Sequence, residues 1–157
     1  MRNRRTGGAA VVLVAFALSG CAQGGAGDST APGGAIEVAV TQTCAAGSSP
    51  DCAEINGEHV LVTDGDFEKV DLKSVSAAGD QAGNAVELEL TPNGAAVLAA
   101  SSTAASKAGD EARLAIRVGD KLMSAVKVME PVTDDHVTIA LPSDVTAREF
   151  AESTRRS

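Results

Sequence analysis

Aromatic side chains are almost missing from this chain of 157 residues, which contains no Trp, no Tyr and only three Phe. Proteins that bind single-stranded nucleic acid stack the bases on aromatic platforms, so the sequence offers little for that function. Sugar-binding surfaces usually have the same requirement. The hydrophobic core must therefore consist mainly of Val, Leu, Ile, Ala and Met.

Positive charge is also scarce. The chain has 13 Lys and Arg against 21 Asp and Glu, which gives a formal net charge of −8 at pH 7. Binding to nucleic acid needs a basic surface that neutralises phosphates, so we expect no nucleic-acid partner. The same deficit argues against attachment to an anionic membrane through charge.

The sequence has no apolar run of the roughly 20 residues that a membrane-spanning helix needs. Its clearest apolar run, AAVVLVAFAL at residues 9–18, follows a basic start, as in the signal peptides of exported proteins. The run leads into LSGC, which ends at Cys21 and resembles the lipobox of bacterial lipoproteins. In those proteins the signal is cut before the cysteine, whose thiol then carries a diacylglyceryl group. The alternative is an ordinary signal peptide with a chance cysteine.

These features predict three segments. Residues 1–20 are expected to be a lipoprotein signal peptide, and Cys21 the lipidated residue, with acyl chains such as palmitate. Residues 21–35, rich in Gly, Ala and Ser, then form the lipidated cysteine and a flexible linker. Residues 36–157 form one domain, which is long enough to fold alone. Since two or more acyl chains anchor a protein stably, we expect a place on the extracytoplasmic face of the cell membrane.

Two of the three cysteines remain once Cys21 is assigned to the lipid. Cys44 and Cys52 would then lie outside the cytoplasm, where disulfides persist. A bond between them would close a loop of about nine residues and stabilise the fold by roughly 2–3 kcal/mol. A metal site is the alternative, but two thiols without a nearby His make a poor one. We therefore predict a Cys44–Cys52 disulfide and no metal.

Alternation of apolar and polar residues predicts the strands. They are expected at residues 36–41, 59–63, 68–75, 86–90, 114–118, 122–128 and 137–141. The two residues Gly119-Asp120 separate the fifth strand from the sixth, and Gly in the first of these positions fits a type II′ hairpin turn.

Two helices are predicted between and after these strands. Thr91-Pro92 is a typical helix start and Gly109 a typical end, with Ala95, Leu98 and Ala99 expected to face the core. A capping-box spacing begins the second helix, at 146–151. The element order predicts an α+β fold, a mainly antiparallel sheet with both helices packed on one face.

Motifs of catalysis are not found. Neither histidine, His59 or His136, occurs in a metal-binding spacing, and there is no nucleophile-elbow motif. Asp64-Gly65-Asp66 lacks the remaining ligands of a calcium loop. A Ser-His-Asp triad needs no adjacent residues and stays open as an alternative. We predict a protein that is not an enzyme and has no cofactor.

The stretch from residue 86 to 151, VELELTPNG followed by LAI, GD, SA, EPV and TAREFA, resembles the first large extracytoplasmic head domain of SecD and SecDF. Those membrane proteins assist protein export. The resemblance covers roughly residues 60–155 and implies a ferredoxin-like, SecD-head-like fold. The sequence departs from the family's pattern in three ways. Gly119-Asp120 stands where the family has Asp-Gly, and Ser124-Ala125-Val126 stands where it has Ser-Ala-Pro. The family's transmembrane helices are missing. The chain alone therefore cannot be a proton-driven motor.

In that family the head is implicated in holding emerging, unfolded preproteins. Carried over, this implies a lipid-anchored binding module whose partners are secreted polypeptides or components of the Sec translocase. Its surface is expected on the second hairpin strand, at Ser124 and Ala125 of the matching motif, and near it at Met123 and Met129, since Met lines adaptable binding surfaces. The alternative for the two Met residues is a place in the core, which is the commoner one for Met in a strand. The alternative is a surface lipoprotein that binds a small ligand or an envelope protein, which a deep pocket would favour over a flat groove.

Overall fold

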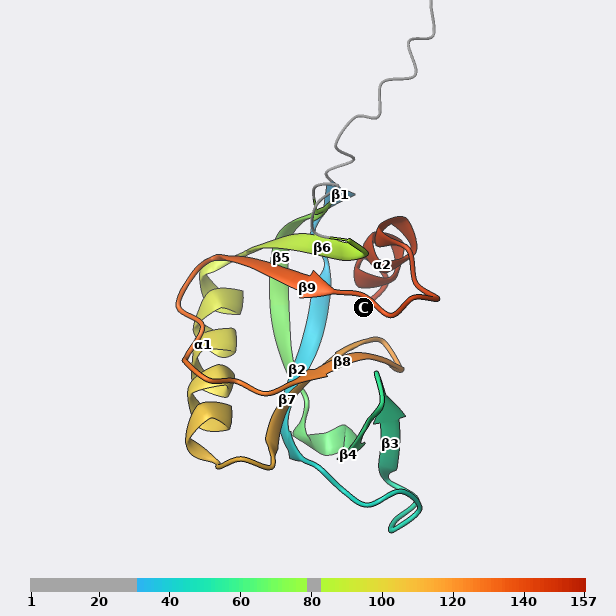
Figure 1. The fold of residues 1–157 in the computed structure, drawn as a ribbon. Coiled ribbons are helices and arrows are strands. Elements are labelled where there is room, and N and C mark those ends of the chain that lie inside the picture. The colour runs from blue at the N-terminus through green and yellow to red at the C-terminus, as the bar shows by residue number, and fades with distance from the viewer. Residues whose placement is uncertain (1–30, 79–82) are drawn as a thin grey trace, which may run out of the picture.

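The structure, a computed structural model, describes residues 31–78 and 83–157. The predictions for residues 1–20 and for Cys21 lie outside the described residues. The fold is α+β with a mainly antiparallel sheet, which confirms the predicted class (Figure 1). In chain order the elements are β1 (Ala31–Pro32), β2 (Ala35–Gln42), β3 (Cys52–Ile55), β4 (Glu58–Leu61), the short 3-10 helix η1 (Asp64–Asp66), β5 (Glu68–Ala77), β6 (Ala85–Leu90), α1 (Pro92–Lys107), β7 (Ala112–Val118), β8 (Lys121–Val126), β9 (His136–Ala140) and α2 (Ala147–Thr154).

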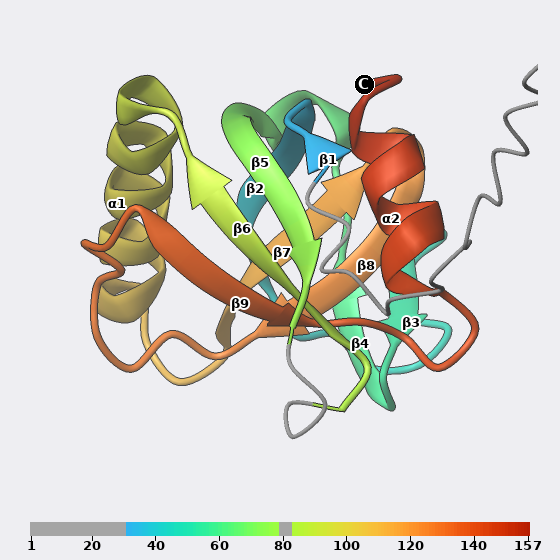
Figure 2. The same ribbon diagram turned by 90° about the horizontal axis from the view of Figure 1, so that it is seen from above.

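The main sheet has the strand order β8-β7-β2-β5-β6-β9, and every pair in it is antiparallel. Strand β5 joins its two halves, because β5 pairs with β2 near its start and with β6 after Leu72. The register shifts between Leu72 and Ser74, an irregularity that bends a strand and increases its twist. The sheet is strongly twisted, with α1 on one side of the molecule and α2 on the other (Figure 2).

One face of this sheet carries the hydrophobic core. The pairings Val38↔Ile116 and Val86↔Ile139 place apolar side chains from both halves on the same face. Leu98 of α1 and Phe150 of α2 belong to the same core cluster, and Phe150 is fully buried. The alternating pattern of the sequence therefore specifies which face is covered.

Both helices begin where the sequence places them, whereas α2 runs on to Thr154, beyond the predicted end at 151. Thr91 caps α1 by accepting a hydrogen bond from Gly94 N, and Thr146 and Glu149 form the reciprocal capping box of α2. The buried stripe of α1 differs from the expected one, because Ala95 and Ala99 are only half-buried. Its buried residues are Gly94, Leu98, Ser101, Ser102 and Ala105.

The domain begins earlier than predicted. Residues 31–35, assigned to the linker from composition, belong to the sheet: Ala31 pairs with Val75 in β1, and Ala35 begins β2. Glycine is required between them for a steric reason. A Cβ on Gly33 would lie 1.8 Å from Leu72 O, and one on Gly34 would lie 2.0 Å from Thr154 O. The Gly pair lets the first strand pass close to β5 and the end of α2.

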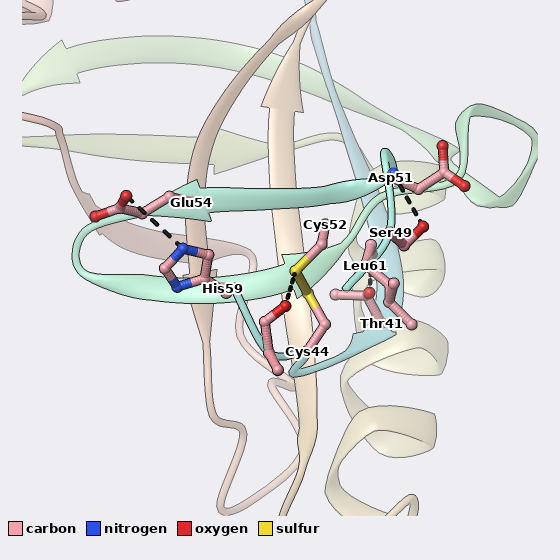
Figure 3. The surroundings of a disulfide bond; sticks show 9 residues. Thr41, Cys44, Ser49, Asp51, Cys52, Glu54, His59 and Leu61 are labelled. Atoms are coloured by element: carbon pink, nitrogen blue, oxygen red, sulfur yellow. Dashed lines mark hydrogen bonds and ion pairs between the residues drawn. A yellow bond between two sulfur atoms is a disulfide. The ribbon is translucent and has the colours of Figure 1, made fainter. Parts of the chain in front are cut away.

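The hairpin β3–β4 lies against the other side of β2 and β7. Its two-residue turn, Asn56-Gly57, has φ angles of 52° and 81°, both in the left-handed region that a type I′ turn requires. The predicted disulfide Cys44–Cys52 is present, with a Cα–Cα distance of 6.1 Å, and ties the hairpin to the end of β2 (Figure 3). An isolated bridge from Thr43 to Val60 adds to this connection.

Side chains also attach the hairpin to the sheet. Arg113 of β7 donates to Glu58 of β4, with an Nη2–Oε1 distance of 2.5 Å, and Thr41 donates to the Leu61 carbonyl. Ala39 and Ala115 face away from the core, yet both are buried. The hairpin therefore covers a second, smaller apolar surface. Among the described residues, no helix combines the length and apolar character needed to cross a bilayer.

Candidate functional site: an apolar cavity between the outer strands

The two outer strands of the main sheet, β8 and β9, line one cavity of about 400 Å³. Ser124 and Val126 contribute from β8, and Val137 and Ile139 from β9. Deeper in the core, the lining is formed by Ile36, Leu88, Leu98, Leu114 and Ile116. The sheet thus curls far enough to bring its two edges to one cavity without pairing them. We call this site the β8–β9 cavity.

Register explains which side chains reach the β8–β9 cavity. Ile116 pairs with Ser124 and Leu114 with Val126, and residues directly opposite on paired strands point to the same face. That face is the core face of β7. The side chains of β8 that point into the cavity are therefore those at every second position, namely Ser124 and Val126.

The segment between β8 and β9, residues 127–135, closes one side of the cavity. Val128 and Val132 pack against the core and line the cavity. The segment is fixed by a hydrogen bond from Val132 N to Ser102 Oγ of α1, 2.9 Å long, and Ser102 is fully buried. The Ser and Thr residues that weaken α1 as a helix former thus include the residue that holds this segment.

The cavity is chemically uniform. Its lining is aliphatic apart from Ser124, Thr138, Lys127 and Glu130, and it includes no aromatic ring. Ser124 is 4% exposed, and its hydroxyl makes no hydrogen bond with any residue of the described segments, so the oxygen atom is reached by solvent from the cavity. Sites for small ligands in proteins typically have volumes of roughly 300–1,000 Å³ and a few polar groups in an apolar lining, and this cavity fits that description.

The mouth of the cavity combines exposed apolar side chains with charge. Met129 is 77% exposed and Val126 42% exposed, although both also line the cavity. Lys127 pairs with Asp110 at an Nζ–Oδ1 distance of 2.8 Å, and this hydrogen bond lowers the pKa of Asp110. The charge of Lys127 is therefore matched, whereas no described residue forms an ion pair with the exposed Glu130.

The structure separates the four binding residues predicted from sequence. Ser124 and Met129 line the cavity. Met123 is 2% exposed and belongs to the core, and Ala125 pairs with Ala115 on the face away from the cavity. Consecutive strand residues point to opposite faces, so Met123, Ser124 and Ala125 do not form one surface.

Other charged groups serve the fold. Arg117 lies between Glu37 and Asp64, at 2.9 and 2.6 Å, with Phe67 below its guanidinium. The hydrogen bond that Arg117 donates to Glu37 is the main cause of the raised pKa of Arg117. Lys73 donates to Glu89 and lowers the pKa of that carboxyl. These contacts join neighbouring strands or the η1 region to the sheet.

The two histidines lie apart from the cavity lining. His59 Nε2 is 3.8 Å from Glu54 in the β3–β4 hairpin (Figure 3), and His136 Nε2 is 3.9 Å from Asp135 at the start of β9. Within residues 31–78 and 83–157, no group of three or more His, Cys, Asp or Glu is arranged to hold a metal ion. The cavity offers a shape for binding and a single buried hydroxyl.

Sequence reasoning missed the cavity itself and the deeper residues that line it. Leu98 is expected to face the core, and Leu114 and Val137 are predicted only as strand residues, because a sequence does not show how closely the two edges of a sheet approach each other. No protein-family model matches the chain, and no curated protein or solved structure matches it either.

Proposed function

We propose that this protein is a non-catalytic, lipid-anchored binding protein at the extracytoplasmic face of the membrane, and that it holds an apolar ligand in the β8–β9 cavity. The observation that carries the proposal is the cavity: about 400 Å³, aliphatic, and open to solvent between two strands. Each ligand methylene buried there contributes about 0.8 kcal/mol. A deep, ligand-sized cavity supports a small ligand better than a flat surface for a folded partner.

The test is direct binding of an apolar fluorescent probe. The chain from residue 22 onward, which includes every described residue and the core, is titrated with Nile red after its folding has been checked by circular dichroism. We expect a saturable rise in fluorescence. Val126→Trp places a large side chain at the mouth on an exposed position and should abolish the rise. Glu87→Trp, on an exposed β6 position outside the cavity lining, is the matched control and should retain it.

Two results would contradict the proposal. If Nile red does not bind, or if both tryptophan variants bind it as the unchanged chain does, the β8–β9 cavity is not a ligand site. A melting temperature measured for both variants separates loss of binding from loss of folding.

Anchoring rests on the lipobox-like sequence that ends at Cys21. Expressed in a bacterium fed with alkyne-tagged palmitate, the full chain should carry the label and sediment with membranes. Cys21→Ser should lose the label. Cys44→Ser is the control, because it removes a different cysteine and leaves the signal intact. Labelling that survives Cys21→Ser would contradict the anchor.

A second candidate function is the holding of nonnative secreted chains, which the resemblance to the SecD head implies. It is favoured by one observation: β8 pairs only with β7 and β9 only with β6 among the described strands, so each offers an open edge. An extended peptide can add to such an edge through main-chain hydrogen bonds. A photo-crosslinker at Met129 of the full chain in cells should then capture secreted chains or translocase subunits, and one at Glu87 should not. Failure to slow aggregation of an unfolded substrate would exclude this role.

A further inference from the structure

We infer that the ligand of the β8–β9 cavity is an acyl-chain amphiphile with an uncharged or cationic head, and that Ser124 recognises the acyl carbonyl. This inference rests on the proposed function, because it names the class of ligand that the same cavity takes. It is carried by the aliphatic lining, the unpartnered hydroxyl of Ser124 and the charges at the mouth.

The lining selects a flexible chain. The apolar side chains around the cavity are Ile, Leu, Val, Met and Ala from the sheet, α1 and segment 127–135, with no Phe among them. A ring system gains much of its specific affinity from aromatic partners, which this cavity does not offer. An aliphatic chain needs only apolar area, which this lining supplies.

Ser124 gives the cavity one specific polar contact. The residue is more than nine-tenths buried, it lines the cavity, and its hydroxyl has no hydrogen-bond partner among the described residues. No side-chain nitrogen or oxygen of the described residues is both enclosed and without a hydrogen-bond partner, so solvent in the cavity reaches the Ser124 hydroxyl and a ligand that fills the cavity would displace that solvent. A hydroxyl can donate to a carbonyl oxygen, so an ester or amide in the ligand would satisfy Ser124, whereas a plain alkyl chain would not.

Charge at the mouth selects the head. Lys127 is paired with Asp110, so its charge is already compensated. Glu130 at the cavity, and Asp134 and Asp135 in the same segment, add negative charge, and the whole chain has a net charge of −8. An anionic head would meet repulsion there, while a cationic or uncharged head would not.

The experiment uses four probes of one chain length below their micelle-forming concentrations: dodecanoylcholine, monododecanoylglycerol, dodecanoate and dodecyltrimethylammonium. Calorimetric titration of the chain from residue 22 onward should give several-fold tighter binding of the first two than of dodecanoate. Dodecanoylcholine should also bind more tightly than dodecyltrimethylammonium, which has the same head charge and no carbonyl.

Variants separate the two parts of the inference. Ser124→Ala should remove most of the advantage of dodecanoylcholine over dodecyltrimethylammonium and leave the binding of the latter unchanged. Glu130→Gln should tighten the binding of dodecanoate and leave the binding of the other three probes largely unchanged. Monododecanoylglycerol is offered both free and in phosphatidylcholine vesicles, and transfer from the vesicles would identify the bilayer as a source.

The outcomes are distinguishable. Nile red binding that Val126→Trp abolishes, combined with dodecanoate as the best probe or with no effect of Ser124→Ala, would overturn this inference and leave the proposed function in place. Absence of Nile red binding would overturn the proposed function, and this inference with it.

Discussion

The two faces of the β2–β7 pair are covered in different ways. The core face is covered by α1 through an aliphatic cluster that includes Leu98. The opposite face is covered by the β3–β4 hairpin, which is held by a disulfide and by polar contacts around Arg113. Hydrophobic burial stabilises the first arrangement, and a covalent link compensates for the small buried area of the second. The β8–β9 cavity lies on the core face, where no single covalent link holds the covering elements in place.

The largest effect is expected from the core face. Leu72→Ala removes a side chain that is 5% exposed and does not line the cavity, so it should destabilise the fold by about 2–5 kcal/mol through lost burial and the void left behind. Chemical denaturation measures this change. Leu61→Ala, on the exposed position of the hairpin, is the control and should change stability far less. Equal losses of stability in the two variants would mean that both faces contribute equally to the free energy of unfolding.

An intermediate effect is expected from the disulfide. Replacing Cys44 and Cys52 by Ser opens a loop of about nine residues and should lower stability by about 2–3 kcal/mol in the chain-entropy model. Hydrogen exchange should show the loss concentrated in β3 and β4, with β5 and β6 protected as before. Uniform loss of protection would show instead that the hairpin is needed by the whole fold.

The smallest effect on stability is expected from a change of pH. A hydrogen bond from Arg113 lowers the pKa of Glu58 below its ordinary value of 4.5, and Lys121 lowers that of Asp144. The unfolded chain binds protons at higher pH than the folded chain, so stability is fully present above the ordinary carboxyl range and falls as the pH drops below about 4.5. Melting temperatures from pH 7 to pH 3 measure the decline. Glu58→Gln should flatten this decline, whereas Glu87→Gln, at an exposed residue that forms no ion pair with the described residues, should not.

Much of the fold was predictable because its strands alternate and its helix ends carry strong capping residues. Thr91-Pro92 and Gly109 predict both ends of α1 closely, and the Thr146–Glu149 box predicts the start of α2 but not its end at Thr154. Strand β3 was missed, although the Asn56-Gly57 pair that follows it is a strong hairpin signal. The residues on either side of this pair alternate too weakly between apolar and polar for the pattern to predict a strand.

The binding site was predictable only in part. Ser124 and Met129 were named for a resemblance and for the adaptability of Met, and both line the cavity. Met123 and Ala125 could not be separated from them without the register of β8 on β7. Similarly, the composition around Gly33 and Gly34 predicts a linker. The close approach of these two residues to β5 and α2 exists only in the folded protein, so the sequence does not show it.

The pairing of β2 with β7 has a consequence for how the chain acquires its structure. Glu37 and Arg117, which pair across these strands, are 80 residues apart in the sequence. Closing so long a loop is entropically costly, and sheets dominated by such contacts fold slowly. A chain that emerges N-terminus first would expose β2 without a neighbour on that side until β7 has followed. Its local hairpins can form early, but the core must wait for nearly the last third of the chain.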